Sequence, residues 1–364
     1  MVFIFVGGYL AYFLYLMLWA NKPWKLRIDK NFAPSITILV PVHNEEKTIE
    51  AKLENIYKAA YPKQKIEVVL ADDASTDSTL EKLNNLPKKY PELRIKVLNQ
   101  KPRVGKAKVL NLALSVSTHD IVIVSDADCC WPSDILARAL PYLSDPTIGA
   151  ITGMGTVENS ELSWIIKGES NYLKATSFLR LGESKIYSTL RFEGGFCAFK
   201  RAAFKKFDCE SGSDDSGTAL RVVQNGFRAI FVPEAKFQTK FPTKLTGKIR
   251  VKIRRANHLM WLWIECLLLM VKGILLLPKR IALCEIFLFV LCPLIFATLL
   301  VLTLVISIVW PTFFAVLAIV LLALSLVPQL RTYLVEVAID NAILFYSLIS
   351  CVRRKRIVAW EKTR

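Results

Sequence analysis

The stretch that decides the fold is I-V-I-V-S-D-A-D, residues 121–128, in which four apolar β-branched residues run into two aspartates separated by one alanine. A short, unbroken apolar run is typical of a strand buried on both faces of a sheet. Asp126 and Asp128 follow it directly, and carboxylate oxygens are the ligands that Mg²⁺ and Mn²⁺ prefer. An isolated D-x-D is more often a solvated acidic turn, so its surroundings decide between the two interpretations.

The residues upstream repeat this arrangement. We expect strands at 36–40, 66–71 and 94–98, and helices at 46–60, 78–85 and 106–115. Alternation of this kind predicts an α/β domain, which we place at residues 34–257. In open α/β sheets, ligands bind at the carboxyl ends of the strands. Polar residues that follow the strands are therefore expected to share one site.

Two of these strand exits carry acidic or ligand-like side chains. Pro41 ends the first strand. His43 fits a packing role and a ligand contact equally well. Asp72 and Asp73 end the second strand, and helix capping explains only part of that motif. Two adjacent acids repel each other, so we expect a partner for them, such as a nucleoside hydroxyl.

Three later groups add charge. Lys106 begins the helix predicted at 106–115 and could approach a phosphate, although Gln100 and Ala107 exclude a P-loop. Asp214 and Asp215 precede the helical run 218–225, where they could cap the helix or supply a general base. A basic strip precedes an apolar segment and could bind lipid headgroups or a diphosphate; it comprises Lys248, Arg250, Lys252, Arg254 and Arg255.

Both ends of the chain favour a membrane. Residues 1–20 are uncharged and match the length of one span, so we interpret them as a retained anchor. Lys22, Lys25, Arg27 and Lys30 follow, which predicts a cytoplasmic middle. We expect an interfacial helix at 258–280, two spans within 281–330, and at 331–364 a basic tail after an amphipathic or membrane-spanning helix.

Composition limits the class of protein. The 364 residues carry a formal charge of +17, with 53% hydrophobic and 22% charged residues, which excludes both a disordered chain and an all-membrane chain. The basic residues concentrate near the membrane segments, so we attribute them to headgroup contact and expect no nucleic-acid partner. The eight cysteines include no C-x-x-C pair, and no zinc or disulfide framework is indicated.

Taken in order, the motifs resemble those of membrane-bound family-2 glycosyltransferases, a group related to polysaccharide synthases and polyprenyl-phosphate sugar transferases. The resemblance rests on P-V-H-N-E-E, D-D-A-S-T-D, G-K-A-K-V-L-N-L-A-L, S-D-A-D, E-G-G-F-C-A-F-K-R-A-A-F and S-D-D. It implies a GT-A-like, Rossmann-type nucleotide-diphospho-sugar transferase domain with a mixed sheet, flanked by transmembrane helices.

The same resemblance implies roles for individual residues. Those that would hold the nucleoside are Pro41, His43, Glu45 and Asp72 or Asp73. Lys106 would approach the phosphates, and Asp126 with Asp128 would hold the nucleotide and Mg²⁺ or Mn²⁺. Gly194 and Gly195 would line the sugar and acceptor pocket, while Asp215, beside Asp214, would be the catalytic base. Arg254 matches the arginine of the family's Q-x-x-R-W motif, but Arg255 replaces the tryptophan and Val251 the glutamine.

The implied activity is an inverting, metal-dependent transfer of one sugar from a nucleotide-diphosphate donor to a lipid-linked or membrane-proximal glycan acceptor. UDP-sugars are favoured over GDP-mannose. A processive polysaccharide synthase is one alternative, which the altered Q-x-x-R-W motif disfavours and the final residues Trp360–Arg364 favour. A non-catalytic subunit of a glycan assembly is another, which the intact Asp126, Asp128 and Asp215 disfavour.

Overall fold

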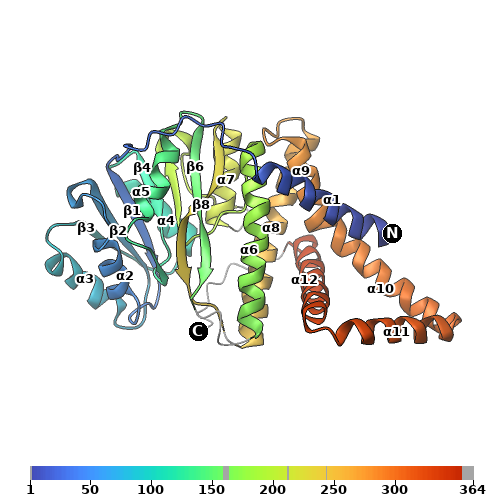
Figure 1. Ribbon diagram of the computed structural model, residues 1–364. Coiled ribbons are helices and arrows are strands. Elements are labelled where there is room, and N and C mark those ends of the chain that lie inside the picture. The colour runs from blue at the N-terminus through green and yellow to red at the C-terminus, as the bar shows by residue number, and fades with distance from the viewer. Residues whose placement is uncertain (1, 159–163, 211–212, 243, 355–364) are drawn as a thin grey trace.

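The computed structural model describes residues 2–158, 164–210, 213–242 and 244–354. Its centre is one eight-stranded sheet in the order β3-β2-β1-β4-β7-β6-β8-β5 (Figure 1). The strands are β1 Ile36–Val42, β2 Ile66–Asp73, β3 Arg94–Gln100, β4 Ile121–Val124, β5 Cys129–Cys130, β6 Ile148–Val157, β7 Cys197–Lys200 and β8 Arg228–Thr239.

The sheet is mixed, which confirms the predicted fold class. Strands β3, β2, β1 and β4 are parallel, whereas β7 runs antiparallel to both of its neighbours, β4 and β6. Val42 of β1 lies opposite Asp72 of β2 in the register, so the two predicted polar strand exits are adjacent. The parallel half places the carboxyl ends of four strands at one edge.

Helices cover both faces of the sheet. They are α2 Ile49–Tyr57, α3 Thr79–Lys89, α4 Lys106–Val116, α5 Ile135–Ala139, α6 Trp164–Ile186 and α7 Asp214–Gln224. Helix α2 begins three residues later than predicted, at Ile49, because residues 44–48 instead form a loop hydrogen-bonded to the β2–α3 connection.

The two faces of the sheet form separate cores. Ile36, Ile38 and Val40 pack on the side of α2 and α3, whereas Leu39 belongs to the opposite core. That second core continues without interruption from the sheet to Leu16, Trp263 and other residues of the outer helices. The α/β domain and the outer helices therefore share one close-packed core, so a movement of one is transmitted to the other.

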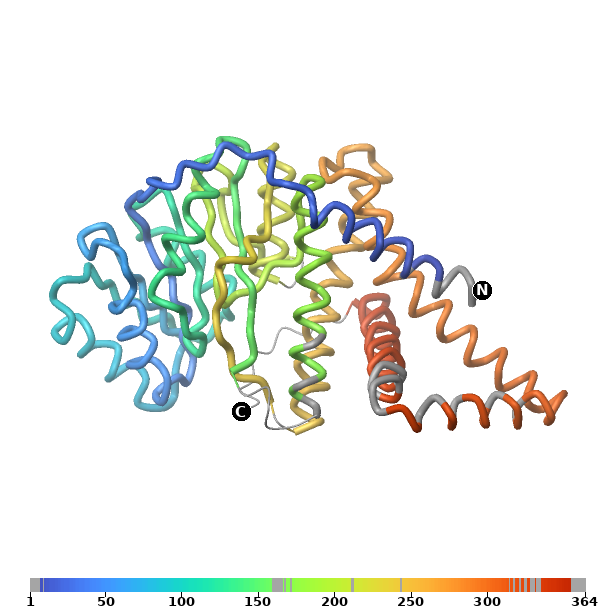
Figure 2. Tube along the Cα trace, viewed as in Figure 1, coloured from blue at the N-terminus to red at the C-terminus, as the bar shows by residue number. Residues whose placement is uncertain are grey.

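The outer helices are α1 Val2–Ala20, α8 Leu245–Val271, α9 Lys279–Ile286, α10 Cys292–Val309, α11 Pro311–Ser325 and α12 Pro328–Val352. Helix α8 takes the place of the interfacial segment predicted at 258–280, but it begins earlier, at Leu245, and includes the whole basic strip. Figure 2 shows α1 and α10 extending away from the sheet, with α12 beside α8.

Two segments of the described chain are long and apolar enough to cross a membrane: Lys279–Val309 and Val335–Val352. Shorter apolar stretches occur at Leu10–Ala20 and Pro311–Val320. Residues 333–352 include Glu336 and Asp340, and carboxylates are costly inside a bilayer. Both are paired with lysines of α8: Glu336 contacts Lys248 and Lys252, and Asp340 lies 2.7 Å from Lys252. Residues Trp360–Arg364 lie outside the described ranges.

Helix α1 packs against α6 at a glycine. A Cβ atom on Gly182 would lie 2.5 Å from the backbone oxygen of Leu16. A side chain at this position would therefore push the two helices apart, since real Cβ contacts do not become so short.

Candidate active site

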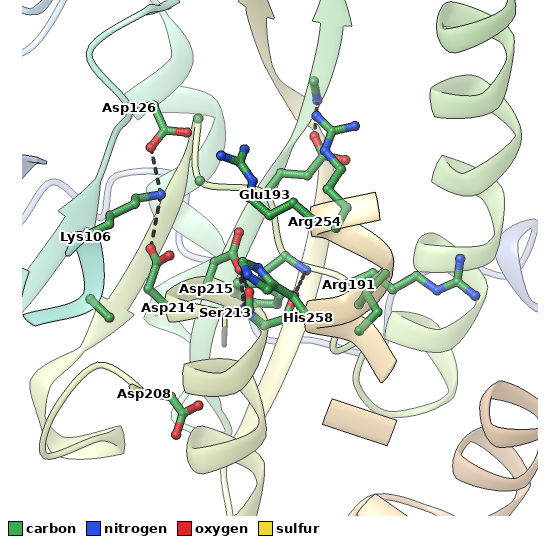
Figure 3. Close-up of a pocket in the computed structure, with 18 of the residues that line it drawn as sticks. Lys106, Asp126, Arg191, Glu193, Asp208, Ser213, Asp214, Asp215, Arg254 and His258 are labelled. Atoms are coloured by element: carbon green, nitrogen blue, oxygen red, sulfur yellow. Dashed lines mark hydrogen bonds and ion pairs between the residues drawn. The ribbon is translucent and has the colours of Figure 1, made fainter. Parts of the chain in front are cut away.

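A pocket lies at the carboxyl end of β4, between the starts of α4 and α7 and the helices α6 and α8 (Figure 3). Its lining includes several of the predicted residues: Lys106, Asp126, Gly194, Gly195, Asp214, Asp215, Arg254 and Arg255. These residues span most of the domain in sequence, and the sheet topology brings them together.

Lys106 connects two acidic motifs. Its Nζ lies 2.8 Å from Oδ1 of Asp126 and 3.1 Å from Oδ2 of Asp214, as Figure 3 shows. Burial disfavours the charged amine, but Asp126, Asp214 and Asp215 outweigh it and raise the pKa of Lys106 well above its usual value. Lys106 therefore carries a positive charge between the end of β4 and the start of α7.

The two carboxylates respond in opposite directions. Burial alone would raise the pKa of Asp126, but the ammonium of Lys106 lowers it below the usual value. For Asp214, burial prevails over Lys106, and nearby Asp215 and Asp126 also help to raise its pKa. The negative charge is thus held more firmly on the D-x-D side of the pocket.

Gly194 makes this close arrangement possible. A Cβ atom there would lie 2.7 Å from Nζ of Lys106 and 2.9 Å from Oδ2 of Asp126. The Gly194 carbonyl also accepts a hydrogen bond of 3.1 Å from the backbone N–H of Asp126. Any other residue at this position would displace the ion pair.

The D-x-D loop offers donor atoms for a cation. Ligand atoms of Asp126, Asp128 and Cys129 lie within 4.8 Å of one another. Burial, together with Asp126 and Asp128, raises the pKa of the Cys129 thiol well above its usual value, so the thiolate that metals bind is disfavoured. The remaining donors are two carboxylates, a set that suits a hard ion such as Mg²⁺ or Mn²⁺.

Asp215 is oriented by the first turn of α7. Its Oδ1 accepts hydrogen bonds from the Ser216 N–H, at 2.7 Å, and from the Ser213 hydroxyl. Ser213 is the N-cap residue and also accepts from Ser216 N–H. Capping and a functional role are thus compatible, because the same hydrogen bonds fix the carboxylate at the pocket wall.

The predicted nucleoside residues lie at the adjoining strand exits, outside the residues that line the pocket. Oδ1 of Asp73 accepts the Val104 N–H and its Oδ2 accepts the Gly105 N–H, each at 2.8 Å. Asp72 accepts from Ser75 N–H and hydroxyl. The repulsion between these two acids is therefore offset by N–H and hydroxyl donors of the chain itself.

The other two residues of that group join the same network. His43 Nδ1 lies 2.9 Å from the Asp73 carbonyl oxygen. Glu45 is buried and accepts from the Thr48 hydroxyl, while its N–H donates to Thr79 Oγ1 at 2.8 Å. Pro41 is buried at the end of β1. These contacts hold the β1–α2 and β2–α3 loops against each other beside the pocket.

The basic strip divides between two faces of α8. Lys248 and Lys252 contact α12, as described above. Arg254 and Arg255 face the pocket, and Arg255 pairs with the buried Glu169 of α6 at 2.8 Å. Burial and the adjacent Arg255 lower the pKa of Arg254, although Asp126 and Asp214 oppose this shift. The strip was predicted to bind either lipid headgroups or a diphosphate. Only Arg254 and Arg255 lie where they could contact a diphosphate in the pocket.

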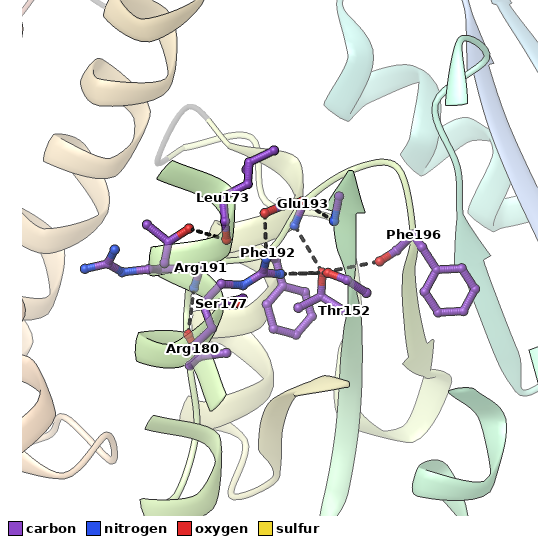
Figure 4. Close-up of polar contacts among 12 residues, drawn as sticks. Thr152, Leu173, Ser177, Arg180, Arg191, Phe192, Glu193 and Phe196 are labelled. Atoms are coloured by element: carbon purple, nitrogen blue, oxygen red, sulfur yellow. Dashed lines mark hydrogen bonds and ion pairs between the residues drawn. The ribbon is translucent and has the colours of Figure 1, made fainter. Parts of the chain in front are cut away.

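Several pocket residues were missed from sequence. Glu193 accepts from Arg180 at 2.5 Å and from the Gly155 N–H at 3.0 Å, and Figure 4 shows it among the contacts around Thr152. Arg191 and His258 also line the pocket. Only Glu193 had a signal in the sequence, as the acid that precedes the two glycines.

Lys52 was missed as well, although it donates a hydrogen bond to the backbone that follows the D-x-D motif. Its Nζ donates to the Cys129 carbonyl at 2.9 Å and lies 4.3 Å from the centre of the Trp131 ring. Burial lowers the pKa of Lys52 to about 8. Lys52 lies between Glu50 and Glu54 in a predicted helix, so the sequence gave no indication of a contact with the distant Cys129 carbonyl.

Comparison with known proteins agrees with this geometry. A family model described as glycosyl transferase family 2 matches residues 37–208. A mannosyltransferase of Pyrobaculum calidifontis, solved in complex with GDP-Man and Mn²⁺, is 30% identical and superposes with a TM-score of 0.83 over 97% of each chain. The chain belongs to glycosyl transferase family 2. It is accordingly a glycosyltransferase with a GT-A-like fold.

Curated relatives of this family-2 chain match over shorter lengths. The beta-monoglucosyldiacylglycerol synthase of a Synechocystis species is 33% identical over 136 residues, 37% of this chain and 28% of that protein. The probable glycosyltransferase YdaM of Bacillus subtilis is 25% identical over 266 residues, 71% of this chain and 62% of that protein. This chain therefore spans less than two thirds of either relative.

Proposed function

We propose that this glycosyltransferase moves one sugar, with inversion, from a nucleoside diphosphate sugar to a hydroxyl of a lipid-linked or membrane-proximal glycan. The observation that carries the proposal is the bridge formed by Lys106. This lysine joins the D-x-D carboxylate Asp126 to Asp214 of α7, and Asp215 lines the same pocket. Donor activation and acceptor deprotonation can then occur side by side.

The donor occupies the end of the pocket near β4 in this proposal. Asp126 and Asp128 would hold a divalent cation, whose positive charge would be available to the departing diphosphate. Lys106 and Arg254 supply further positive charge to the same leaving group. The loops containing His43, Glu45, Asp72 and Asp73 hold the nucleoside at the adjoining strand exits.

Acceptor activation falls to Asp215. Its Oδ1 is engaged by Ser213 and Ser216, so we assign Oδ2 as the atom that removes the acceptor proton. The acceptor oxygen then forms a bond to the anomeric carbon while the bond from that carbon to the diphosphate oxygen breaks. The products are the glycoside, the nucleoside diphosphate and one proton, initially on Asp215.

The identity of the donor is open between two classes. The sequence favoured UDP-sugars, whereas the mannosyltransferase that this chain resembles over 97% of its length was solved with GDP-Man. We therefore propose GDP-mannose as the first donor to test, with UDP-sugars as the comparison. Two observations support a membrane-proximal acceptor: the apolar segments of the chain and the lipid product named for the Synechocystis relative.

The donor can be identified with detergent-purified, full-length protein and Mn²⁺. A nucleotide sugar that binds the native state stabilises it by an amount that grows with the logarithm of the ligand concentration divided by Kd, and so raises the unfolding midpoint. We expect one donor in a panel of GDP- and UDP-sugars to protect the protein and to be slowly hydrolysed, with both effects lost in EDTA. Absence of protection across the whole panel would contradict the proposed donor class.

The assignment of Asp215 has a separate test. Asp215→Asn should lower transfer by about a thousandfold, because general base catalysis is worth roughly that factor, while donor protection persists. Asp120→Asn, at an exposed site, serves as the matched control. Near-normal turnover of Asp215→Asn would show that another group removes the proton.

A further inference from the structure

A buried group of polar side chains joins the pocket to the outer helices. We call it the Arg191 cluster: Tyr12 of α1, Glu183 of α6, Arg191 of the segment before β7, and Glu285 of α9. Arg191 Nε lies 3.0 Å from Oε2 of Glu285, and its Nη2 lies 2.6 Å from Oε1. The Tyr12 hydroxyl lies 2.8 Å from Glu183 and 3.2 Å from Glu285.

The cluster is costly to bury and close to neutral overall. Tyr12 is 6% exposed, Glu183 1% and Glu285 0%. Burial, with Glu285 nearby, raises the pKa of Glu183 to about 8, so Glu183 keeps its proton at neutral pH. One positive guanidinium then faces one carboxylate. Removing either Arg191 or Glu285 would leave the other charge buried and uncompensated, so the two side chains depend on each other.

Simple anchoring of α1 does not require these groups. Apolar contacts already fix the helix, since Leu16 is fully buried and packs against α6 at Gly182. Polar groups within apolar, membrane-type helices are expensive, and their presence is by default a sign of function. Tyr12 and Glu285 therefore call for a role beyond attachment.

The cluster leads directly into the reaction site. Arg191 itself lines the pocket, and in Figure 3 its side chain extends away from Asp214 and Asp215. The next residue, Phe192, donates its N–H to Ser216 Oγ at 3.2 Å, beside Asp215. Two residues further, Gly194 accepts the Asp126 N–H at 3.1 Å. One end of this short segment is thus held by Glu285, and the other by the catalytic-site backbone.

We propose that α1 and α9 form part of the active site, because Tyr12 and Glu285 position Arg191 at the acceptor end of the pocket, where Arg191 contacts the incoming acceptor. Tyr12 and Glu285 are positioning residues, and Arg191 is a specificity-determining residue. This inference rests on the proposed function, since it assigns a further residue to the acceptor site of the same reaction.

The sharpest test removes a single oxygen. Tyr12→Phe deletes the hydroxyl that contacts both carboxylates, whereas Tyr15→Phe makes the same change one turn away on α1, where the hydroxyl is outside the cluster. Both full-length variants are assayed with Mn²⁺, the protecting donor and n-octyl glycosides of glucose, mannose and galactose as acceptor probes.

We expect Tyr12→Phe to raise the acceptor KM about tenfold, the value of one hydrogen bond to a charged group. The donor-induced rise in unfolding midpoint should stay at the wild-type value, and Tyr15→Phe should leave both unchanged. A purely structural role would instead lower stability and affect donor and acceptor alike. Equal acceptor KM for Tyr12→Phe and Tyr15→Phe would overturn the inference.

A second variant guards against misfolding of the first. Arg191→Lys keeps the positive charge but loses the planar fork that Glu285 accepts, so it should reproduce the increase in acceptor KM. Combined with Arg191→Lys, Tyr12→Phe should add less than it does alone, because both changes act on one contact. Full additivity would overturn the inference. Failure of the proposed function would differ from either result, since the wild type itself would then transfer no sugar.

Discussion

At the scale of single residues, Lys106 has the most informative position. It occupies the space between Asp126 and Asp214. A cation that binds Asp126 must compete with this ammonium, whereas a diphosphate gains from it. Loss of Lys106 should therefore increase the affinity for the metal ion alone and decrease the affinity for the nucleotide sugar.

Lys106→Met should bind Mn²⁺ alone more tightly than the wild type does, and the protecting nucleotide sugar about tenfold more weakly, as expected for one lost charge-assisted contact. Manganese binding can be followed by the loss of the free-ion electron paramagnetic resonance signal, and donor binding by thermal protection. Lys47→Met, at an exposed position, is the control. Unchanged Mn²⁺ affinity would show that Lys106 does not compete with the ion.

The sequence predicted the acidic residues of this site better than their partners. Asp126, Asp214 and Asp215 follow recognisable local signals, namely a strand exit and a helix start. Arg180, Arg191 and Lys52 have none, because each acts through a residue distant in the chain, such as Glu193, Glu285 or the Cys129 carbonyl. Asp72 and Asp73 illustrate the reverse case, where the missing partner proved to be the chain's own amides and hydroxyls.

At the scale of elements, Glu67 links three strands and a loop. Its carboxylate accepts from Thr37 of β1 at 2.7 Å, from the Thr118 N–H at 2.9 Å and from Lys96 of β3 at 2.8 Å. Burial would raise the pKa of Glu67, but these hydrogen bonds lower it from 4.5 to about 2. The charged form is thus favoured by the folded sheet.

Because the pKa is lower in the folded state, this stabilisation is complete above about pH 4.5 and disappears as the pH falls toward 2. Glu67→Gln should reduce the free energy of unfolding by about 3 kcal/mol at pH 7, and by progressively less below pH 4.5. Denaturant titrations at several pH values measure this, with the exposed Glu81→Gln as control. A cost independent of pH would contradict the assignment.

The elements also show where local patterns were insufficient. The parallel strands β1 to β4 were predictable as short apolar runs, and a helix follows each of β1, β2 and β3. The antiparallel insertion of β7 between β4 and β6 was not, because Cys197–Lys200 is short and its place depends on long-range pairing. Helix α8 likewise extends to Leu245, since Glu336 and Asp340 of α12 neutralise the lysines that made its first half resemble a surface strip.

At the scale of the whole molecule, the arrangement of charges and apolar helices predicts an orientation. The basic residues that follow α1 predict that the catalytic domain lies in the cytoplasm. If the apolar segments Lys279–Val309 and Pro311–Val320 cross the membrane as a hairpin, the turn around Trp310 faces the opposite side. The second core, which joins the sheet to the outer helices, then holds the pocket next to the bilayer.

Cysteine labelling tests this topology. Cys130 and Cys209 are exposed on the catalytic domain, so a membrane-impermeant maleimide should label them only after cells are permeabilised. Thr312→Cys, placed at the start of α11, should add a label in intact cells. Labelling of the native cysteines in intact cells, with none at position 312, would reverse the proposed orientation.

The contact between Leu16 and Gly182 also constrains the order of events during synthesis. Helix α1 leaves the ribosome roughly 160 residues before its partner on α6, and at 5–20 residues per second this amounts to about ten seconds or more. During that interval the nascent chain holds Tyr12 without Glu183 or Glu285. The first helix therefore has no packing partner on α6 until translation delivers the residues that complete this contact.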